Sequence, residues 1–228
     1  MANITSPFGA QDLRRIDGGS PTMGLEQHWI MSSDPTAIFN GDLVQANLQT
    51  PVTGNPYSYI TQGTSALATG VGSYKGVFRG CEYYSPTVGR IIWSQYFPGT
   101  GSSGDIKCYV QTDGNLMYLA QATSAAVLGS SNISQTIQTT GTTSAGNASS
   151  NGNTTTGISA AQVGSSSVSS AATNSSYAWR IYGFYTDVLG GGSSAFATYV
   201  NGLDNTSPGQ VLVLLPNNFM TKSTTGDE

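Results

Sequence analysis

Short apolar runs, several with alternating polar positions, recur along most of the 228-residue chain between glycine, proline and asparagine. The clearest alternation covers 76–84, whose alternate side chains form two sets, one ending at Tyr83 and the other at Tyr84. Successive side chains of a strand point to opposite faces, so one set should be buried. Further strands are expected at 57–60, 90–97, 106–111, 177–188, 195–200 and 210–215. The pattern predicts an all-β fold, either a β-sandwich or a β-barrel.

An Asn-Gly pair at Asn40-Gly41 separates the β-rich runs 37–39 and 43–45. This dipeptide favours the positive φ angles of a tight turn, which predicts a hairpin or a sharp β corner. Asp42 follows directly, and an Asp beside a turn glycine typically accepts hydrogen bonds from nearby backbone amides. A turn role is therefore favoured over a catalytic one for this carboxylate.

The glycine-rich segment 98–104 is expected to connect strands 90–97 and 106–111 as a hairpin. Its spacing also matches a dinucleotide-binding loop, but that motif requires a helix to follow, and here a strand is expected. The best helical window is 117–128, and it lacks a clear cap and a clean apolar stripe. At most a short helix is expected there.

Domain organisation follows from changes in composition. Residues 1–33 show no sustained period and are expected to form an extended arm that contacts either a neighbouring subunit or its own domain. Residues 34–228 form the β-rich body, which the uncharged, Gly/Ser/Thr/Asn-rich run 114–179 divides into possible subdomains 34–126 and 127–228. Apolar residues at strand spacing within this run predict an ordered polar β region.

Charge and cysteine content narrow the classes of partner. Charged residues make up 9% of the chain, the net charge is −4, and the basic residues are dispersed, which argues against nucleic acid as a partner. Cys81 and Cys108 are expected to be buried free thiols. The sequence contains no apparent signal peptide or membrane-spanning run, so we expect synthesis in the cytoplasm and no membrane partner.

Candidate catalytic groups are few. His28 is the only histidine and has no adjacent nucleophile or second metal ligand, so a structural role is favoured and neither a metal nor a cofactor is expected. A glycosidase needs only two carboxylates, and no pair stands out. The carboxylates considered are Asp34, Asp42, Glu82, Asp105, Asp113 and Asp187. We expect no enzymatic activity.

Aromatic residues cluster between 83 and 97 and include Tyr83, Tyr84 and Trp93. They are interpreted either as hydrophobic core or as a rigid anchor surface of the kind found in interfaces and sugar-binding faces. Because Tyr83 and Tyr84 are consecutive on an expected strand, they should point to opposite faces. One of them is therefore available either to a second buried layer or to a partner.

Four segments together resemble the decoration, or cement, proteins on the capsids of tailed double-stranded DNA bacteriophages. They are the start MANITSPFGAQDLRRIDG, the run IFNGDLV from Ile38, the block GVFRGCEYYSPTVGRIIWSQYFPG from Gly76, and GNTTTGIS from Gly152. The resemblance lies in their combination and order. The long Ser/Thr/Asn/Gly stretch departs from that pattern.

The resemblance implies a β-rich homotrimer, located on the exterior of the virion, that binds the major capsid protein and stabilises the shell. We expect the arm, with Phe8, Arg14 and Arg15, to grip the capsid or a sister subunit, and Tyr83, Tyr84 and Trp93 to contribute to an interface. The alternatives are a head fibre or host-glycan-binding protein and, third, a carbohydrate-active enzyme.

Overall fold

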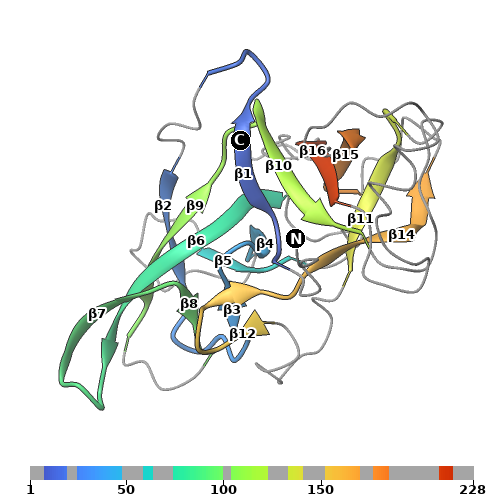
Figure 1. Cartoon of the computed structure of the whole chain (residues 1–228). Coiled ribbons are helices and arrows are strands. Elements are labelled where there is room, and N and C mark those ends of the chain that lie inside the picture. Colours follow the sequence, from blue (N-terminus) through green and yellow to red (C-terminus); the bar gives the residue numbers. More distant parts are fainter. Residues whose placement is uncertain are drawn as a thin grey trace, which may run out of the picture.

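All regular elements in the described part of the computed structural model are β-strands, which confirms the all-β prediction (Figure 1). The strands form two six-stranded sheets and two short two-stranded pairs. The predicted strand 195–200 lies outside the described residues. The structure describes residues 8–19, 25–47, 59–63, 74–99, 104–122, 133–140, 152–169, 177–184 and 211–217.

The first sheet closes into a five-stranded barrel. Its strands are β2 (Leu25–Ile30), β4 (Leu43–Ala46), β5 (Tyr59–Gln62), β6 (Tyr74–Ser85) and β9 (Ile106–Gln111). Their order is β4-β5-β2-β9-β6, and β6 pairs back onto β4. The β2–β5 pair is parallel and the other pairs are antiparallel. A sixth strand, β7 (Arg90–Ser94), pairs with β6 outside the closed ring.

Apolar side chains from the barrel strands fill its interior, together with residues of the short pair formed by β3 (Ile38–Phe39) and β8 (Tyr96–Phe97). All members of this core cluster are fully buried. They are Ile30, Ile38, Val44, Ile60, Phe78, Cys81, Phe97, Ile106, Cys108 and Val110. The closed ring leaves none of its five strands with a free edge along its paired length.

The second sheet covers one side of the barrel. Its order is β1 (Gln11–Arg15), β10 (Leu116–Gln121), β16 (Val211–Pro216), β15 (Trp179–Phe184), β11 (Thr136–Thr140) and β14 (Gln162–Ser169). A parallel bridge between Ala122 and Val163 brings β14 back to the end of β10. The predicted polar β region therefore contributes β11 and β14 to this sheet.

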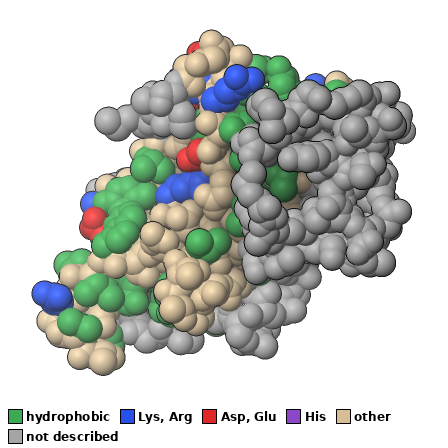
Figure 2. Space-filling model, viewed as in Figure 1, with side chains coloured by type: hydrophobic (Ala, Val, Ile, Leu, Met, Phe, Trp, Pro, Cys, Tyr) green, Lys and Arg blue, Asp and Glu red, His purple; other side chains and the backbone are tan. Residues whose placement is uncertain are grey.

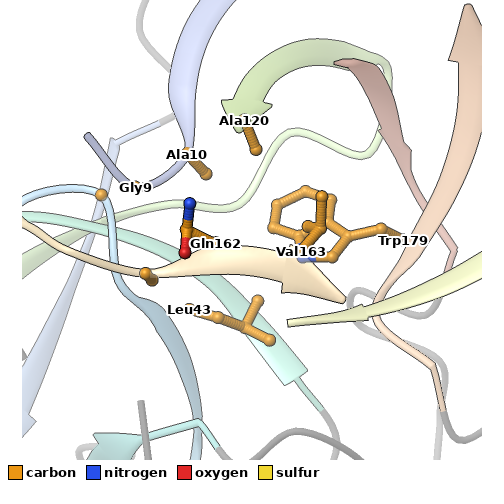
Figure 3. A pocket seen from close by; sticks show the side chains of 9 residues that line it. Gly9, Ala10, Leu43, Ala120, Gln162, Val163 and Trp179 are labelled. Atoms are coloured by element: carbon orange, nitrogen blue, oxygen red, sulfur yellow. The ribbon is translucent and has the colours of Figure 1, made fainter. Parts of the chain in front are cut away.

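A second core lies between the barrel and this sheet. The barrel contributes Leu43, Tyr74 and Val77, and the sheet contributes Tyr118 and Trp179 among others. The rings of Tyr118 and Trp179 meet edge to face, with their centroids 5.2 Å apart. Side chains from both layers converge on a hollow of about 10 Å³, room for about one water molecule (Figure 3). The two layers are thus closely packed.

A β-bulge in β6 explains why this strand serves both cores. The pairing with β9 shifts between Phe78 and Gly80. Before the shift, Val77 lies in the core between the layers and Phe78 lies in the barrel, and after it Cys81 lies in the barrel. The simple two-face alternation predicted for 76–84 is therefore interrupted, since a bulge inserts one extra residue into the strand.

The window 117–128, where at most a short helix is expected, begins in β10, and its residues 123–128 lie outside the described residues. Tyr118 in this strand is fully buried between the layers, so tertiary packing outweighs the weak helical pattern there. One local prediction was wrong. The strands at 90–97 and 106–111 do not form a hairpin with each other. Instead β7 pairs with β6, whereas β9 pairs with β2 and β6.

The 1–33 segment contributes strands to both sheets. Within it, β1 pairs with β10 and β2 is a strand of the closed barrel. The barrel draws its strands from 25–111, and the second sheet combines β1 with strands from 116–216. The described parts of the arm therefore pack on their own domain, the alternative left open by the sequence.

The different burial of Trp179 and Trp93 predicts a large and a small loss of stability for a matched pair of tryptophan substitutions. Trp179→Ala empties the packed core between the layers, where the side chain is 1% exposed, and should lower the free energy of unfolding by about 4 kcal/mol. Trp93→Ala, at a side chain that is 54% exposed, should lower it by about 1 kcal/mol or less. Urea unfolding measures both values. Equal losses would contradict this arrangement of the core.

Candidate functional site

The end of β6 and the whole of β7 form a hairpin that projects beyond the barrel, at the lower left of Figure 1. Its register pairs Ser85 with Arg90 across the turn, and the Gly89 amide donates to the Ser85 carbonyl oxygen at 2.8 Å. Beyond β6, β7 pairs with no other described strand. The hairpin is therefore an extension of the barrel wall rather than part of its closed ring.

Four large apolar side chains are exposed on this hairpin. Tyr84 is 41% exposed, Val88 54%, Ile91 69% and Trp93 54%. They are four of the nine large hydrophobic residues that are exposed in the described part of the chain, and Tyr84 lies directly opposite Ile91. Figure 2 shows apolar side chains gathered at the lower left, where Figure 1 places the hairpin. This concentration distinguishes the hairpin from scattered surface hydrophobics.

The base of the hairpin holds Trp93 in place. A Cβ atom built on Gly80, whose φ is +146°, would lie 2.5 Å from Cζ2 of Trp93, so only glycine allows the indole to lie on this backbone. The ring of Tyr109 packs at a tilt against the indole of Trp93, with the ring centroids 5.3 Å apart. The Tyr109 hydroxyl donates to Glu82 at 3.0 Å, and Glu82 pairs with Lys107 at 3.7 Å. The exposed aromatic surface is therefore preorganised.

Tyr83 lies on the opposite face of the same strand. It is partly buried and packs against the barrel core, whereas Tyr84 is exposed. The prediction that these consecutive tyrosines point to opposite faces is confirmed. Tyr83 thus anchors the hairpin to the barrel, and Tyr84 is available to a partner.

At the corner between β3 and β4, a fully buried carboxylate at Asp42 forms the centre of a junction. Its Oδ2 accepts from the backbone amide of Phe39 at 2.8 Å and from Nε2 of Gln62 at 3.1 Å. Its Oδ1 accepts from the hydroxyl of Ser159. Burial outweighs these bonds and raises the pKa of Asp42 from 3.8 to about 6. The turn role predicted for Asp42 is confirmed, and the contact with Ser159 extends it across the fold.

The turn before Asp42 is a sharp corner rather than a hairpin. Gly41 has a φ of +99°, and the Asp42 amide donates back to the Phe39 carbonyl oxygen at 2.9 Å. The strands on either side, β3 and β4, pair with β8 and with β5 and β6 respectively. The corner therefore passes the chain from a short pair into the barrel.

All four segments that carry the phage resemblance meet at this corner. The Gly41 carbonyl oxygen accepts from the Ala10 amide at 2.9 Å, and the Gly41 amide donates to the Phe78 carbonyl oxygen at 2.9 Å. Arg79 donates to the Ala10 carbonyl oxygen and to Oδ1 of Asn40, both at 3.0 Å, and its guanidinium pairs with Asp12. These contacts join the chain start, the Asn-Gly corner and β6.

The GNTTTGIS segment completes the junction as a small hairpin of β12 (Gly152–Asn153) and β13 (Ile158–Ser159). Asn40 donates its amide to the Gly157 carbonyl oxygen and accepts from the Ser159 amide, both at 2.9 Å. Oδ1 of Asn153 accepts from the amides of Thr155 and Thr156 and thereby shapes the turn. The threonine run of this segment forms the turn between the two strands.

The structure does not bring the six predicted interface residues together. Arg14 is exposed on β1, which lies far from the β6–β7 hairpin in Figure 1. Arg15 is half-buried and pairs with Asp17 and Asp113 at 3.4 and 3.5 Å, and Phe8 is half-buried beside the corner. Tyr83, Tyr84 and Trp93 do share the hairpin.

Sequence reasoning missed Val88 and Ile91. Ile91 and Trp93 are two positions apart and therefore share a strand face, and Val88 precedes the turn residue Gly89. This pattern could have predicted an apolar hairpin tip.

The carboxylates considered as catalytic candidates accept hydrogen bonds or form ion pairs locally, except Asp187, which lies outside the described residues. Thus Asp105 accepts from the Tyr59 hydroxyl at 2.6 Å and from the Ser32 amide at 3.1 Å. Among the described residues no cluster of three or more potential metal ligands occurs. An open polar recess of about 270 Å³ beside Asp34 and Asn47 is slightly smaller than typical ligand sites.

Comparisons with protein-family models, with curated proteins and with solved structures find no match to this chain. Within the ranges that the structure describes, no helix has the length and apolarity needed to cross a membrane. The candidate site therefore rests on the chain's own geometry: an exposed apolar hairpin built on a barrel that a buried junction holds together.

The raised pKa of Asp42 predicts a pH-dependent stability. Because the folded protein binds this proton more tightly than the unfolded chain, the protonated group contributes about 3 kcal/mol of stability, which is present in full only below pH 3.8. The contribution falls as the pH rises through about 6, so that about 2 kcal/mol of it is lost between pH 4 and 7. Asp42→Asn should remove this contribution, whereas Asp17→Asn, at an exposed carboxylate, should retain it. Urea unfolding of the three proteins between pH 4 and 7 measures it, and parallel curves for wild type and Asp42→Asn would refute it.

Proposed function

We propose that this protein is a structural component of a phage virion that binds the outside of the capsid as a decoration or cement protein. The observation that carries the proposal is the projecting hairpin, with Tyr84, Ile91 and Trp93 exposed on a rigid base. The sequence resemblance supports it further, since the four segments that carry the resemblance form one connected junction in the fold.

The hairpin has the chemistry of an interface core. Aromatic and aliphatic side chains that are already ordered lose little conformational entropy when a partner covers them. Arg90, at the tip, forms no ion pair with another described residue, so an apolar capsid surface with a carboxylate at its edge would complement it. A capsid repeats such a surface many times, so modest contacts at each copy add up to a substantial stabilisation of the shell.

The proposal includes assembly as a homotrimer on the exterior of the virion, after synthesis in the host cytoplasm. Three copies would present three hairpins to the major capsid protein, which raises the effective concentration of each contact. Trimeric state and location come from the phage resemblance.

A second candidate is a head fibre or host-glycan-binding protein. The exposed indole of Trp93 favours it, because a flat aromatic face beside polar groups is a typical sugar-stacking surface. No observation on the described residues favours the third candidate function, a carbohydrate-active enzyme.

Ile91→Asp should lower the affinity of the purified protein for capsids that lack it by about 100-fold, because a charge would be buried at the centre of the contact. The matched control is Leu25→Asp, at a side chain that is 51% exposed on β2. Both variants should keep the free energy of unfolding within about 0.5 kcal/mol of the wild-type value. Cosedimentation with capsids measures the affinity.

Two outcomes would contradict the proposal: wild-type binding by Ile91→Asp, or an equal loss with Leu25→Asp. Phage particles that carry Ile91→Asp separate the two candidate functions. Leakage of DNA on warming indicates a cement protein, whereas failed adsorption to the host with stable heads indicates a glycan-binding protein.

Deletion of residues 1–20 is a poor test of the arm, because it would remove β1 and the Asp12–Arg79 pair from the body.

A further inference from the structure

Two cysteines face each other across the wall of the barrel. Cys81 of β6 is the direct register partner of Cys108 of β9. The neighbouring pair, Glu82 and Lys107, forms an ion pair on the outer face. Since successive residues alternate between faces, both cysteines point into the barrel, where each is fully buried in the same core cluster.

Both cysteines are free thiols in the structure, and their register places the two Cα atoms within the span of a disulfide. Directly opposite residues in an antiparallel pair have Cα atoms about 4.5 or 5.5 Å apart, and both values lie within the range of about 4.4–6.8 Å that disulfides span. Burial, together with the neighbouring Cys81, raises the pKa of Cys108 well above its usual 9.0.

We propose that Cys81 and Cys108 form an intramolecular disulfide that closes the β6–β9 wall covalently when the chain meets an oxidant. The oxidant is a low-molecular-weight disulfide such as oxidised glutathione. One cysteine thiolate attacks it, forming a mixed disulfide and releasing one reduced thiol. The second cysteine thiolate then attacks the protein sulfur of that mixed disulfide and releases the other thiol. The two leaving thiolates take up the protons that the cysteines lost.

The sealed core determines when the bond forms. Burial raises the pKa of Cys81 to about 12, and exchange requires the thiolate, so the folded barrel reacts slowly. Oxidation therefore occurs while the chain folds or when β6 and β9 separate locally. A protein made in a reducing cytoplasm would contain thiols, and one folded in an oxidising medium would contain the bond.

The bond would stabilise the root of the projecting hairpin, because Cys81 is three residues before Tyr84 on β6. It closes a loop between residues 81 and 108 and so restricts the unfolded state. The thermal midpoint should rise by roughly 10 °C. This inference is independent of capsid binding.

The test uses the full-length protein in two arms. In the first arm the protein is refolded from urea with either oxidised or reduced glutathione. In the second arm the folded protein is incubated with oxidised glutathione in moderate urea. The expected product is a monomer lighter by two hydrogen atoms, with the peptides containing Cys81 and Cys108 linked, and with a raised midpoint that a reductant reverses. Cys108→Ala should show neither the link nor the rise.

Several results would overturn the inference. One is that the protein folds in the presence of oxidised glutathione in both arms, and that both thiols can still be alkylated when it is denatured afterwards. Another is that glutathione adducts or disulfide-linked dimers form instead of the internal bond. A third is an internal bond that leaves the midpoint unchanged or lowers it, which would show that the barrel does not accommodate the link.

Discussion

The buried carboxylate of Asp42 is the interaction on which the rest of the described structure depends. A charged or polar group without water must be satisfied by donors, and here the donors come from Phe39, Gln62 and Ser159. These residues are far apart in sequence, and they are close only when the corner, the barrel and the β12–β13 hairpin are all in place. The cost of leaving the carboxylate unsatisfied therefore couples these parts into one structure.

Closure of the barrel has a consequence at its surface. The pairing of β4 with β6 completes the ring, and the remaining length of β6 continues outward with β7 as its only partner among the described strands. The junction and the two cores bury most of the large apolar residues of the described fold. The hairpin carries four of the nine large hydrophobic residues that are exposed in the described fold, and these four sit on an ordered base. This contrast favours recognition of a partner over a role in packing.

The sequence predicted features that depend on local chemistry: the β class, the turn at Asn40-Gly41 and the opposite faces of Tyr83 and Tyr84. Long-range pairing was not predictable, because alternation identifies a strand without identifying its neighbour. Thus β9 pairs with β2 and β6 instead of with 90–97. The sequence of β10 shows only a weak helical pattern. Its strand conformation depends on burial against Trp179, a residue far along the chain. The bond from Ser159 to Asp42 is equally non-local.

Hydrogen exchange of the free and the capsid-bound protein tests the central claim, that a rigid body presents its apolar hairpin to the shell. Amides from Tyr83 to Trp93 should gain protection on binding, while the Phe39 and Gly41 amides of the junction should be protected in both states. The contrary result is an unchanged hairpin with new protection elsewhere on the surface, or a junction that exchanges freely in the free protein.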